Sequence, residues 1–466
     1  MKKSLTSLFF MLISASVFSQ KDSTALTIEQ FLEIVRQYHP VVKLSDITIK
    51  KSEADITIAR GAFNPVLSTI VSNKTFNNIT YFDYLNPNIT LPVWYGVEIN
   101  TGFENLSGNR FDPSETIGQS SYVGMSIPLL KNFVIDKRRA YLRQSKMYNE
   151  MAYTEKQTMI NNVLMEAVTQ FWDWTNAYKT YEIVQKNLNV SQRRFNLVKR
   201  TFFNGERPAI DTIEAMTQFQ NFEFQKNESW LNFQNESLKL SAFLWQEGNN
   251  AFQLPEYIIP QNDRDIETDI QNFQLNLSEL LANAQQFHPE LQLYKQKLDV
   301  LQIDKKLKFQ ELLPKLDFKY NHLNKGYNAF AGNGLLFQNN YQYGLKLEMP
   351  LLFSQGRGEF KKAKLKLEET EIVRRQKALS INLKVKSYYN EIVTLRNQIE
   401  LQQTIIVNYM KMLNAEEILF KNGESSLFLI NSRENKLLET ERKLIELKTK
   451  YFKAVYALKW STGLLR

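Results

Sequence analysis

The sequence predicts an α+β membrane protein, in which long α-helical coiled-coil hairpins carry transmembrane β-strands and one structural plan occurs twice. Three observations support this fold class. The chain of 466 residues repeats itself over long stretches, a long region lacks both glycine and proline, and several extended segments alternate between apolar and polar side chains. Helices favour the second pattern, because glycine and proline are costly inside them, and strands favour the third.

Residues 1–19 are predicted to be a secretory signal peptide. Lys2 and Lys3 form a basic start, residues 5–17 form a short apolar stretch, and Ser19 suits the position before cleavage. Losing two lysines lowers the net charge from +9 to +7, with 56 basic against 49 acidic side chains. Acids and bases are interleaved along the chain, which is typical of solvated helix surfaces and argues against a nucleic-acid partner.

Cysteine is absent from the chain, and no run of about 18 apolar residues follows residue 19. Disulfides, thiolate metal ligands and a lipid-bearing cysteine are therefore excluded. Transmembrane helices are excluded as well, so any attachment to a membrane has to come from the folded chain.

An internal duplication organises the sequence. When the chain is displaced by 249 residues, Leu26–Leu67 aligns with Leu275–Leu316 without a gap. The offset falls to 222 where Ile127–Leu130 meets Met349–Leu352, and to 218 at two Phe-x-Asn-Gly-Glu segments. Repeats of this length indicate a duplicated structure rather than a solenoid.

Each repeat is predicted to hold the same elements in the same order. A short helix leads to a His-Pro pair, and a second helix, extended segments, a very long helix, a tight turn and a returning helix follow. The predicted domains are the first repeat at 20–245, a connecting segment at 246–274 and the second repeat at 275–466. Strands are expected at about 66–130 and 315–352, and the turns are expected at 204–206 and 422–424.

Two of the three histidines occupy equivalent positions, as His39-Pro40 and His288-Pro289. Proline suits the first turn of a helix and disfavours helical geometry in the residue before it. Both histidines are therefore predicted to lie at corners between two helices. The alternative is a metal site, but it would need more ligands than these two histidines and His322 supply together.

The extended segments present one apolar and one polar face. In residues 341–348 the odd-numbered side chains are Tyr or Leu, and the even-numbered ones are Gln, Gly, Lys and Glu. Similar alternation occurs at 316–322, 93–103 and 121–129. Segments of this length can cross a bilayer as tilted strands, with lipid on one side and water on the other. The alternative is a half-buried sheet of a water-soluble protein.

The strand count predicts an oligomer. The second repeat offers strands at 315–323 and 340–351, so the first repeat is expected to cross the membrane twice as well. Four transmembrane strands per chain cannot close a barrel alone, because a sheet in lipid leaves no open edge and natural barrels begin near eight strands. The first repeat has three candidates, at 66–73, 92–104 and 119–130, and we expect one of them to lie outside the membrane.

The long helices are predicted to pair as hairpins. Residues 138–202 would extend about 97 Å as one helix at ~1.5 Å per residue. Apolar residues recur along both long helices at the spacing of coiled-coil seams, which need partner helices. Each hairpin turns at Asn-Gly, where glycine adopts the left-handed conformation that ends a helix. Turn geometry alone is enough to explain Gly205 and Gly423. The alternative, functional interpretation is that the tips form a docking surface.

Together these segments resemble the TolC-like outer-membrane efflux proteins over nearly the whole mature chain. The resemblance is carried by paired segments: LTIEQFLEIVRQYHPVVK with LSELLANAQQFHPELQ, FNPVLS with LLPKLD, IPLLKNF with MPLLFSQGRG, and the two Phe-x-Asn-Gly-Glu tips. The family often has Asn before the helix-starting proline, where this chain has His39 and His288.

The resemblance implies a homotrimer, in which three chains build a 12-stranded β-barrel among outer-membrane lipids and an α-barrel tunnel across the periplasm. Such a channel is a passive exit duct of a tripartite efflux or type I secretion system. Its tips meet a periplasmic adaptor protein and an inner-membrane transporter that supplies the energy. No catalytic residue, cofactor or metal is expected.

The resemblance also implies a periplasmic gate and adaptor-docking surface at the tips. Its expected residues are Asn204, Gly205, Glu206, Asp211, Phe420, Asn422, Gly423, Glu424, Leu429 and Ser432. Asp211 matches an acid that holds the closed tip in the family. Its usual partners are missing: Phe420 stands in place of a tyrosine, Ser425 in place of an arginine, and Leu429 and Ser432 in place of acids.

Closure of this entrance is therefore expected to use other contacts. Apolar packing of Phe420, Leu427 and Leu429 is one hypothesis, and Glu424 could partly replace the missing acids. Two other classes of protein remain as alternatives: a periplasmic coiled-coil scaffold or adaptor without a barrel, and a secreted enzyme. Adaptors carry one hairpin rather than two copies, and the sequence holds no catalytic constellation. The cargo and the partner pump are not encoded in any motif.

Overall fold

The structure is a computed structural model that describes residues 24–112, 114, 117–261, 276–328 and 336–465. The predicted signal peptide and part of the predicted connecting segment lie outside these residues. The chain divides into two compact units, one formed by residues 1–44, 157–288 and 380–466 and the other by residues 45–156 and 289–379. Each unit takes segments from both predicted repeats, so the repeat boundaries stay a prediction.

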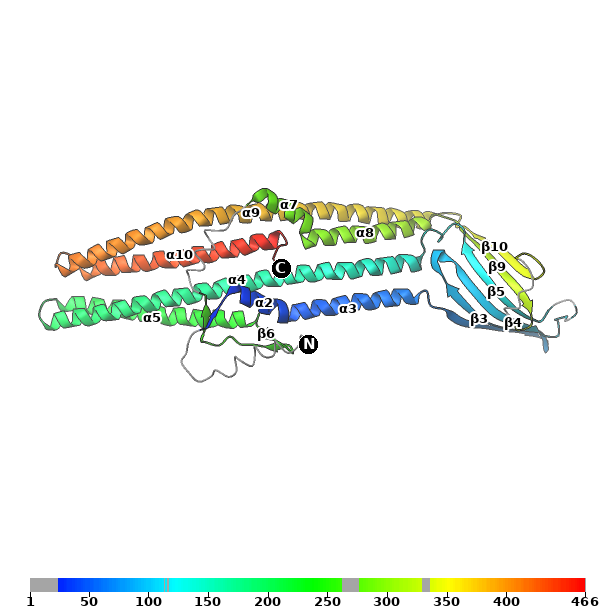
Figure 1. The fold of residues 1–466 in the computed structure, drawn as a ribbon, viewed down its shortest axis with the longest axis horizontal. Coiled ribbons are helices and arrows are strands. Elements are labelled where there is room, and N and C mark those ends of the chain that lie inside the picture. The colour runs from blue at the N-terminus through cyan, green and yellow to red at the C-terminus, as the bar shows by residue number, and fades with distance from the viewer. Residues whose placement is uncertain (1–23, 113, 115–116, 262–275, 329–335, 466) are drawn as a thin grey trace, which may run out of the picture. The chain divides into compact units, whose positions relative to one another are not determined.

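The helices follow the duplicated order that the sequence predicts (Figure 1). In the first half they are α2 (Ile28–Tyr38), α3 (Pro40–Gly61), α4 (Lys137–Phe203) and α5 (Ala209–Ser241). In the second half they are α7 (Leu277–Phe287), α8 (Pro289–Gln310), α9 (Ser354–Lys421) and α10 (Leu427–Ser461). No helix in the described part of the chain holds an apolar stretch long enough to cross a bilayer.

The histidine corners are confirmed. His39 ends α2, with its backbone N–H donating to the carbonyl of Val35 at 3.1 Å, and α3 begins at Pro40. The His39 imidazole Nδ1 then accepts the backbone N–H of Val41 at 3.3 Å, which caps the first turn of α3. His288 ends α7 in the same way, and no group of metal-ligating side chains occurs among the described residues.

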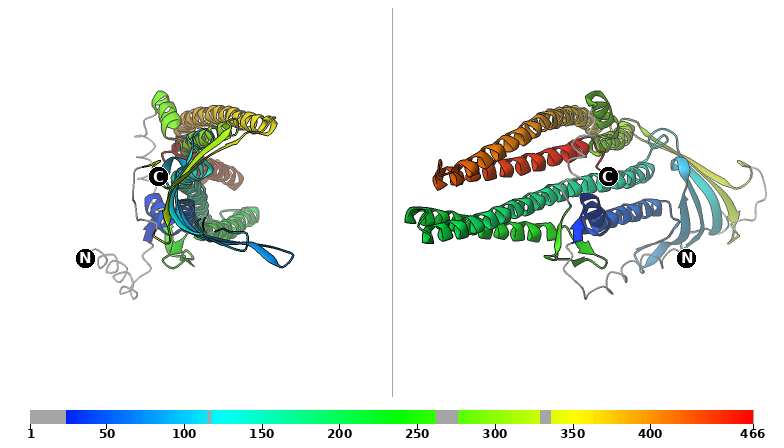
Figure 2. Two further views of the ribbon diagram at one scale, coloured as in Figure 1. Left: turned by 90° about the vertical axis from the view of Figure 1, so that its right-hand side faces the viewer. Right: turned by 60° about the vertical axis from the view of Figure 1, so that its left-hand side comes forward.

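One antiparallel sheet of six strands lies in the unit formed by residues 45–156 and 289–379. Its strands are β2 (Val66–Phe76), β3 (Ile79–Pro92), β4 (Glu98–Ser107), β5 (Gln119–Pro128), β9 (Lys315–Lys325) and β10 (Tyr341–Glu348). Their order across the sheet is β10-β9-β5-β4-β3-β2, and they form one curved layer (Figure 2). The β5–β9 pair joins the two halves of the duplication.

The sheet holds six strands, and which of them cross a membrane stays a prediction. All three candidates of the first repeat belong to it, although the one expected at 92–104 begins later, at Glu98. A fourth strand, β3, was not predicted. It follows β2 through Asn77 and Asn78, both in the left-handed conformation that suits a two-residue hairpin turn. The fall in repeat offset from 249 to 222 therefore reflects an additional hairpin.

Two faces of the sheet differ in polarity, as predicted. Directly opposite residues share a face, and one row across the strands reads Leu91, Ile99, Met125, Tyr320 and Tyr343. A row on the other face reads Thr90, Asn100, Gly124, Asn321 and Gln342.

Gly124 is required in that polar row. A Cβ there would lie 2.1 Å from the Asn321 Oδ1, which accepts the Asn100 amide at 3.2 Å. Glycine thus lets the amide of Asn321 reach across β5 to β4, and the polar side chains form a continuous contact.

In the other unit, helices pack through aromatic side chains. Trp172 of α4 stacks on Phe452 of α10 with 4.3 Å between ring centroids, and Phe171 stacks on Phe31 of α2. Trp174 is fully buried and donates from its indole N–H to Ser237 of α5. Two small sheets complete this unit: β1 (Thr24–Leu26) with β8 (Ile258–Pro260), and β6 (Trp245–Gln246) with β7 (Asn250–Ala251).

Candidate functional site: the two helical tips

The turns that end α4 and α9 have the same hydrogen-bond geometry. At the first tip the N–H of Gly205 donates to Phe202 O (2.9 Å) and that of Glu206 to Thr201 O (3.0 Å). At the second tip the N–H of Gly423 donates to Phe420 O and that of Glu424 to Leu419 O. Both are Schellman motifs, which satisfy the last carbonyls of a helix.

Glycine is needed at both tips for its backbone rather than for space. The φ angles of Gly205 and Gly423 are +75° and +80°, and a Cβ at either position would meet no atom within 4 Å. The backbone of Asn204, Glu206, Asn422 and Glu424 is thereby turned outward, and all four residues are exposed.

Arg207 links the two tips of one chain. Its guanidinium lies 3.6 Å from the ring centroid of Phe420 and donates to the Phe420 carbonyl at 2.9 Å. It also pairs with the Asp211 carboxylate at 3.3 Å, one turn further along α5. The predicted site residues Asp211 and Phe420 thus come together through a side chain that was not among the predicted site residues. Its four-residue spacing from Asp211 was the available signal.

An apolar cluster lies directly behind this link. It comprises Val198, Ala215, Phe420, Leu427 and Ile430, which come from α4, α5, α9 and α10. Phe420 and Leu427 therefore pack within their own chain, with 9% and 1% of their surfaces exposed. Leu429 is 41% exposed, and Ser432 is also exposed, so neither belongs to this cluster.

The second tip has polar contacts of its own. The Ser425 hydroxyl donates to the Glu416 carboxylate at 2.5 Å, and Arg433 pairs with the same carboxylate at 3.7 Å. Ser425 replaces the arginine expected in the family, and its partner is a residue of the preceding helix. Sequence spacing could not reveal this contact, because it depends on how α9 and α10 face each other.

A charged group is buried beneath the tips. Arg194 of α4 pairs with Glu434 of α10 at 2.7 Å and with Glu417 of α9 at 3.3 Å. The side chain of Glu434 is only 2% exposed. Because an unpaired buried carboxylate is costly, Arg194 fixes the alignment of three helices at this level.

Helices α5 and α10 are joined by a ladder of polar side chains. Asn431 donates to Glu214 (3.3 Å), and Gln218 donates to Asn435 (2.9 Å). Further along, Arg442 donates to Gln225 (2.9 Å). The partners are 217 residues apart in every pair, so equivalent helices of the two repeats run parallel and in constant register.

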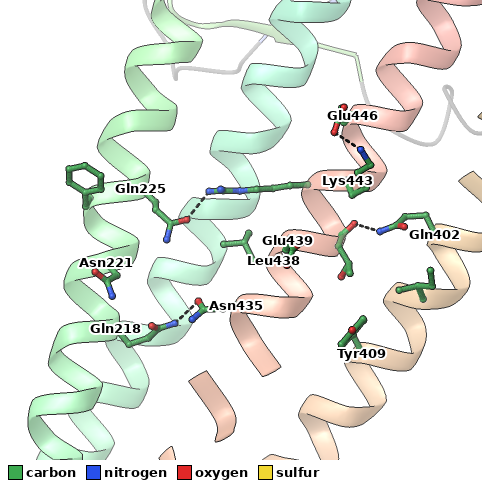
Figure 3. A pocket seen from close by; sticks show the side chains of 14 residues that line it. Gln218, Asn221, Gln225, Gln402, Tyr409, Asn435, Leu438, Glu439, Lys443 and Glu446 are labelled. Carbon is green, nitrogen blue, oxygen red and sulfur yellow. Dashed lines mark hydrogen bonds and ion pairs between the residues drawn. The ribbon is translucent and has the colours of Figure 1, made fainter. Parts of the chain in front are cut away.

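A polar groove of ≈ 880 Å³ follows this ladder between α5, α9 and α10 (Figure 3). It is lined by four of the ladder residues, Gln218, Gln225, Asn435 and Arg442, and by others that include Gln402, Tyr409, Glu439 and Lys443. Burial lowers the pKa of the Arg442 guanidinium, and the Glu228 carboxylate partly opposes that effect. The side chains in this groove are suited to hydrogen bonding and ion pairing.

Apolar side chains are exposed on both tips. Phe203 and Ile210 flank the first turn, at 73% and 63% exposure, and Phe428 follows the second turn at 66%.

The comparisons with known proteins agree with this architecture. Residues 280–464 match the family profile described as outer membrane efflux protein. The Campylobacter jejuni CmeC outer membrane channel is 13% identical, with 94% of this chain and 85% of that chain covered and a TM-score of 0.64. The outer membrane protein VceC from Vibrio cholerae is also 13% identical, with 94% and 96% covered and a TM-score of 0.65.

The open state of the Neisseria gonorrhoeae MtrE outer membrane channel is 11% identical, with 97% of this chain and 94% of that chain covered and a TM-score of 0.63. A comparison with curated proteins gives no match. At these identities the solved structures define the fold, which is that of the TolC-like channels.

The family match covers less than half of the chain, and the solved structures show that the chain as a whole has the fold of outer membrane channels. The TolC-like channels form trimers.

Proposed function

We propose that three copies of this chain form a passive exit duct across the periplasm and the outer membrane. Lipid surrounds the apolar face of the sheet, and cargo passes along the polar face. The tips at 204–206 and 422–424 dock a periplasmic adaptor protein, which connects the duct to an inner-membrane transporter that supplies the energy. The duct serves efflux or type I secretion.

The sheet is the observation that supports this proposal most strongly. It separates an apolar row of side chains from a polar row, and each of its outer strands has one unpaired side in the described chain. A lone sheet of this kind leaves backbone groups unsatisfied in lipid, so neighbouring copies have to complete it.

Membrane fractionation followed by native mass spectrometry tests the proposal. We expect the protein to stay with the outer membrane after a high-salt wash, and to have the mass of three chains once detergent has extracted it. Release by salt alone, or a monomeric mass, would favour the periplasmic scaffold and contradict the duct.

In this proposal the entrance is held by Arg207 instead of the tyrosine and arginine that the resemblance implied. Arg207 binds the start of α5 to the end of α9 through the ring and the carbonyl of Phe420. Phe420 and Leu427 support the link from behind, and the exposed Leu429 is available to meet a neighbouring copy.

Changing Arg207→Ala should therefore loosen the tips. Loss of the cation–π contact and of a charged hydrogen bond costs about 1–3 kcal/mol at such a site. That energy corresponds to a change of more than 5-fold in the equilibrium between closed and open tips. We therefore expect single-channel conductance in planar bilayers to rise at least about 2-fold. Arg207→Lys should give an intermediate value, since it keeps the charge but not the planar fork.

Arg193→Ala is the matched control, because Arg193 lies on α4, is exposed and contacts only the carbonyl of Asn189 among the hydrogen bonds of the described chain. It should leave conductance unchanged. Leu429→Ala tests the second contact. If Arg207→Ala and Leu429→Ala both behave like the control, neither residue holds the entrance.

A further inference from the structure

The two outer strands of the sheet are open for pairing. In the described chain β10 pairs only with β9, and β2 pairs only with β3. All eleven residues of β2 and all eight residues of β10 are exposed. Strand edges in this state attract further strands, and in lipid they cannot remain unpaired.

The directions of these edges allow identical copies to join. Every neighbouring pair in the sheet is antiparallel, and the number of strands is six. The two outer strands, β2 and β10, therefore run in opposite directions. When β2 of one copy lies beside β10 of the next, the new pair is antiparallel like all the others.

The register across the sheet has the slope that a barrel requires. Val66, at the start of β2, is connected through Thr90, Asn100, Gly124 and Asn321 to Gln342 of β10. β10 ends at Glu348, at the same end of the sheet where β2 begins with Val66. Gln342 lies six residues before Glu348, so the straight row across the sheet meets β10 six residues away from that end. The register thus advances by about one residue per strand. With a rise of ~3.4 Å and a spacing of ~4.8 Å, this corresponds to a tilt of about 35°, as in closed barrels.

From these three observations we infer that β2 of one copy pairs with β10 of the next, so that every chain contributes six strands to the wall. This inference rests on the trimeric duct proposed above. Three copies of a six-stranded sheet give 18 strands, instead of the 12 that the resemblance implies. The partner is a second copy of this chain.

Matching the periplasmic ends of the two strands sets the register of the new pair. Val66 then lies opposite Glu348, and Ser68 lies opposite Lys346. Both pairs fall on the polar face. Val66 pairs with Thr90 of the polar row, so Val66 and Ser68 lie on that face of β2. Lys346 and Glu348 lie four and six residues from Gln342, so they share its polar face on β10. Leu67 and Leu347 meet on the apolar face.

A narrower wall is the competing arrangement. In it the β2–β3 hairpin lies outside the barrel, and β4 of one copy meets β10 of the next. The contacts of β3 favour its place in the wall. Tyr84 and Asn86 of β3 contact Glu104 of β4 at 3.1 and 3.3 Å, and Tyr122 of β5 donates to Asn86. Expelling the hairpin would break this polar group.

Disulfide trapping distinguishes the two arrangements, because the chain has no cysteine of its own. The test variant combines Ser68→Cys with Lys346→Cys, and the matched control combines Asn100→Cys with the same Lys346→Cys. Within one chain, each pair is separated by intervening strands, so only neighbouring copies can be joined. Two further variants combine Ser68→Cys with Gly344→Cys or with Glu348→Cys. They detect the same strand pair if its register is displaced by two residues in either direction.

Mild oxidation of the extracted protein should convert the Ser68 variant into covalent dimers and trimers on denaturing gels, and reductant should reverse this. The Asn100 variant should remain monomeric on the same gels. The opposite result would place the β2–β3 hairpin outside the wall and overturn the inference. So would the absence of any cross-link from the Ser68 pairs in a protein with trimeric native mass. A monomeric native mass would instead contradict the trimeric duct itself.

Discussion

At the scale of single residues, His39 makes contacts that favour its neutral form. Its Nδ1 accepts the N–H of Val41 at the start of α3, and its ring stacks on Phe243. Burial lowers the pKa of His39 below its ordinary value near 6.5, and the Glu166 carboxylate only partly opposes this effect. The folded chain therefore favours the neutral imidazole, which can accept the hydrogen bond.

Stability should consequently fall as the pH drops below 6.5. In that range the unfolded chain takes up a proton that the folded chain resists, so protonation favours unfolding. His39→Asn keeps a capping acceptor without a titrating group, so its thermal unfolding midpoint should change less between pH 7.5 and pH 5.5 than that of the wild type. Tryptophan fluorescence of the extracted protein measures both midpoints.

His39→Ala serves as the control, since it removes the acceptor at every pH. It should lower stability by about 0.5–2 kcal/mol even at pH 7.5. An Asn variant with the full pH dependence of the wild type would show that another group causes it.

Some features of the tips could be predicted from the sequence and others could not. Its Asn-Gly-Glu segments predict both turns, because the left-handed conformation depends on the local chain alone. The partner of Phe420 could not be predicted, because Arg207 reaches that ring only once two hairpins lie side by side. Phe420 was expected to close the entrance by apolar packing with Leu427 and Leu429, and it packs with Leu427 inside its own chain. The tip residues as a docking surface stay a proposal.

At the scale of elements, the tip glycines should act on the helix ends through their backbone. Gly205→Ala and Gly423→Ala would each force a side chain into the left-handed conformation, at a cost of about 1–2 kcal/mol. We expect faster hydrogen exchange at the amides of Glu206 and Glu424, which complete the two turns. An increase of at least about 5-fold corresponds to 1 kcal/mol.

Gly358→Ala is the matched control within α9. It also has no atom within 4 Å of an added Cβ, but its φ angle is an ordinary one, so it should stabilise the helix by about 0.5–1 kcal/mol. Equal effects at Gly205 and Gly358 would contradict the argument from backbone geometry.

Strand prediction succeeds where one face is uniformly apolar and fails where polar residues and proline interrupt it. β9 and β10 were predicted within a few residues from their alternation. β3 was missed because Pro87 and two neighbouring asparagines suggest a loop. The structure accommodates Pro87 where the β3–β4 pairing is interrupted, between Leu85 and Asn88. That interruption is a property of the pair of strands and is not visible in either strand alone.

At the scale of the whole molecule, the two faces of the sheet predict opposite tolerance to charge. Leu345 lies on the apolar face and is 64% exposed, whereas Gly344 lies on the polar face with open space around it. Leu345→Lys should cost about 2–4 kcal/mol in the membrane and Gly344→Lys much less. Assembled trimer in the outer membrane should therefore drop at least about 10-fold for the first variant only. Similar yields of both variants would mean that lipid does not contact Leu345.

The near-equal lengths of α4 and α9, at 67 and 68 residues, restrict how genes for such a protein can change. One inserted codon within either helix would turn every later side chain by about 100° and misalign all contacts beyond it, the Arg194 group included. A whole hairpin inserted between α3 and α4 preserves the directions of both sheet edges and leaves the helices untouched. During evolution, related chains should therefore gain strands two at a time, while the lengths of their long helices stay nearly constant.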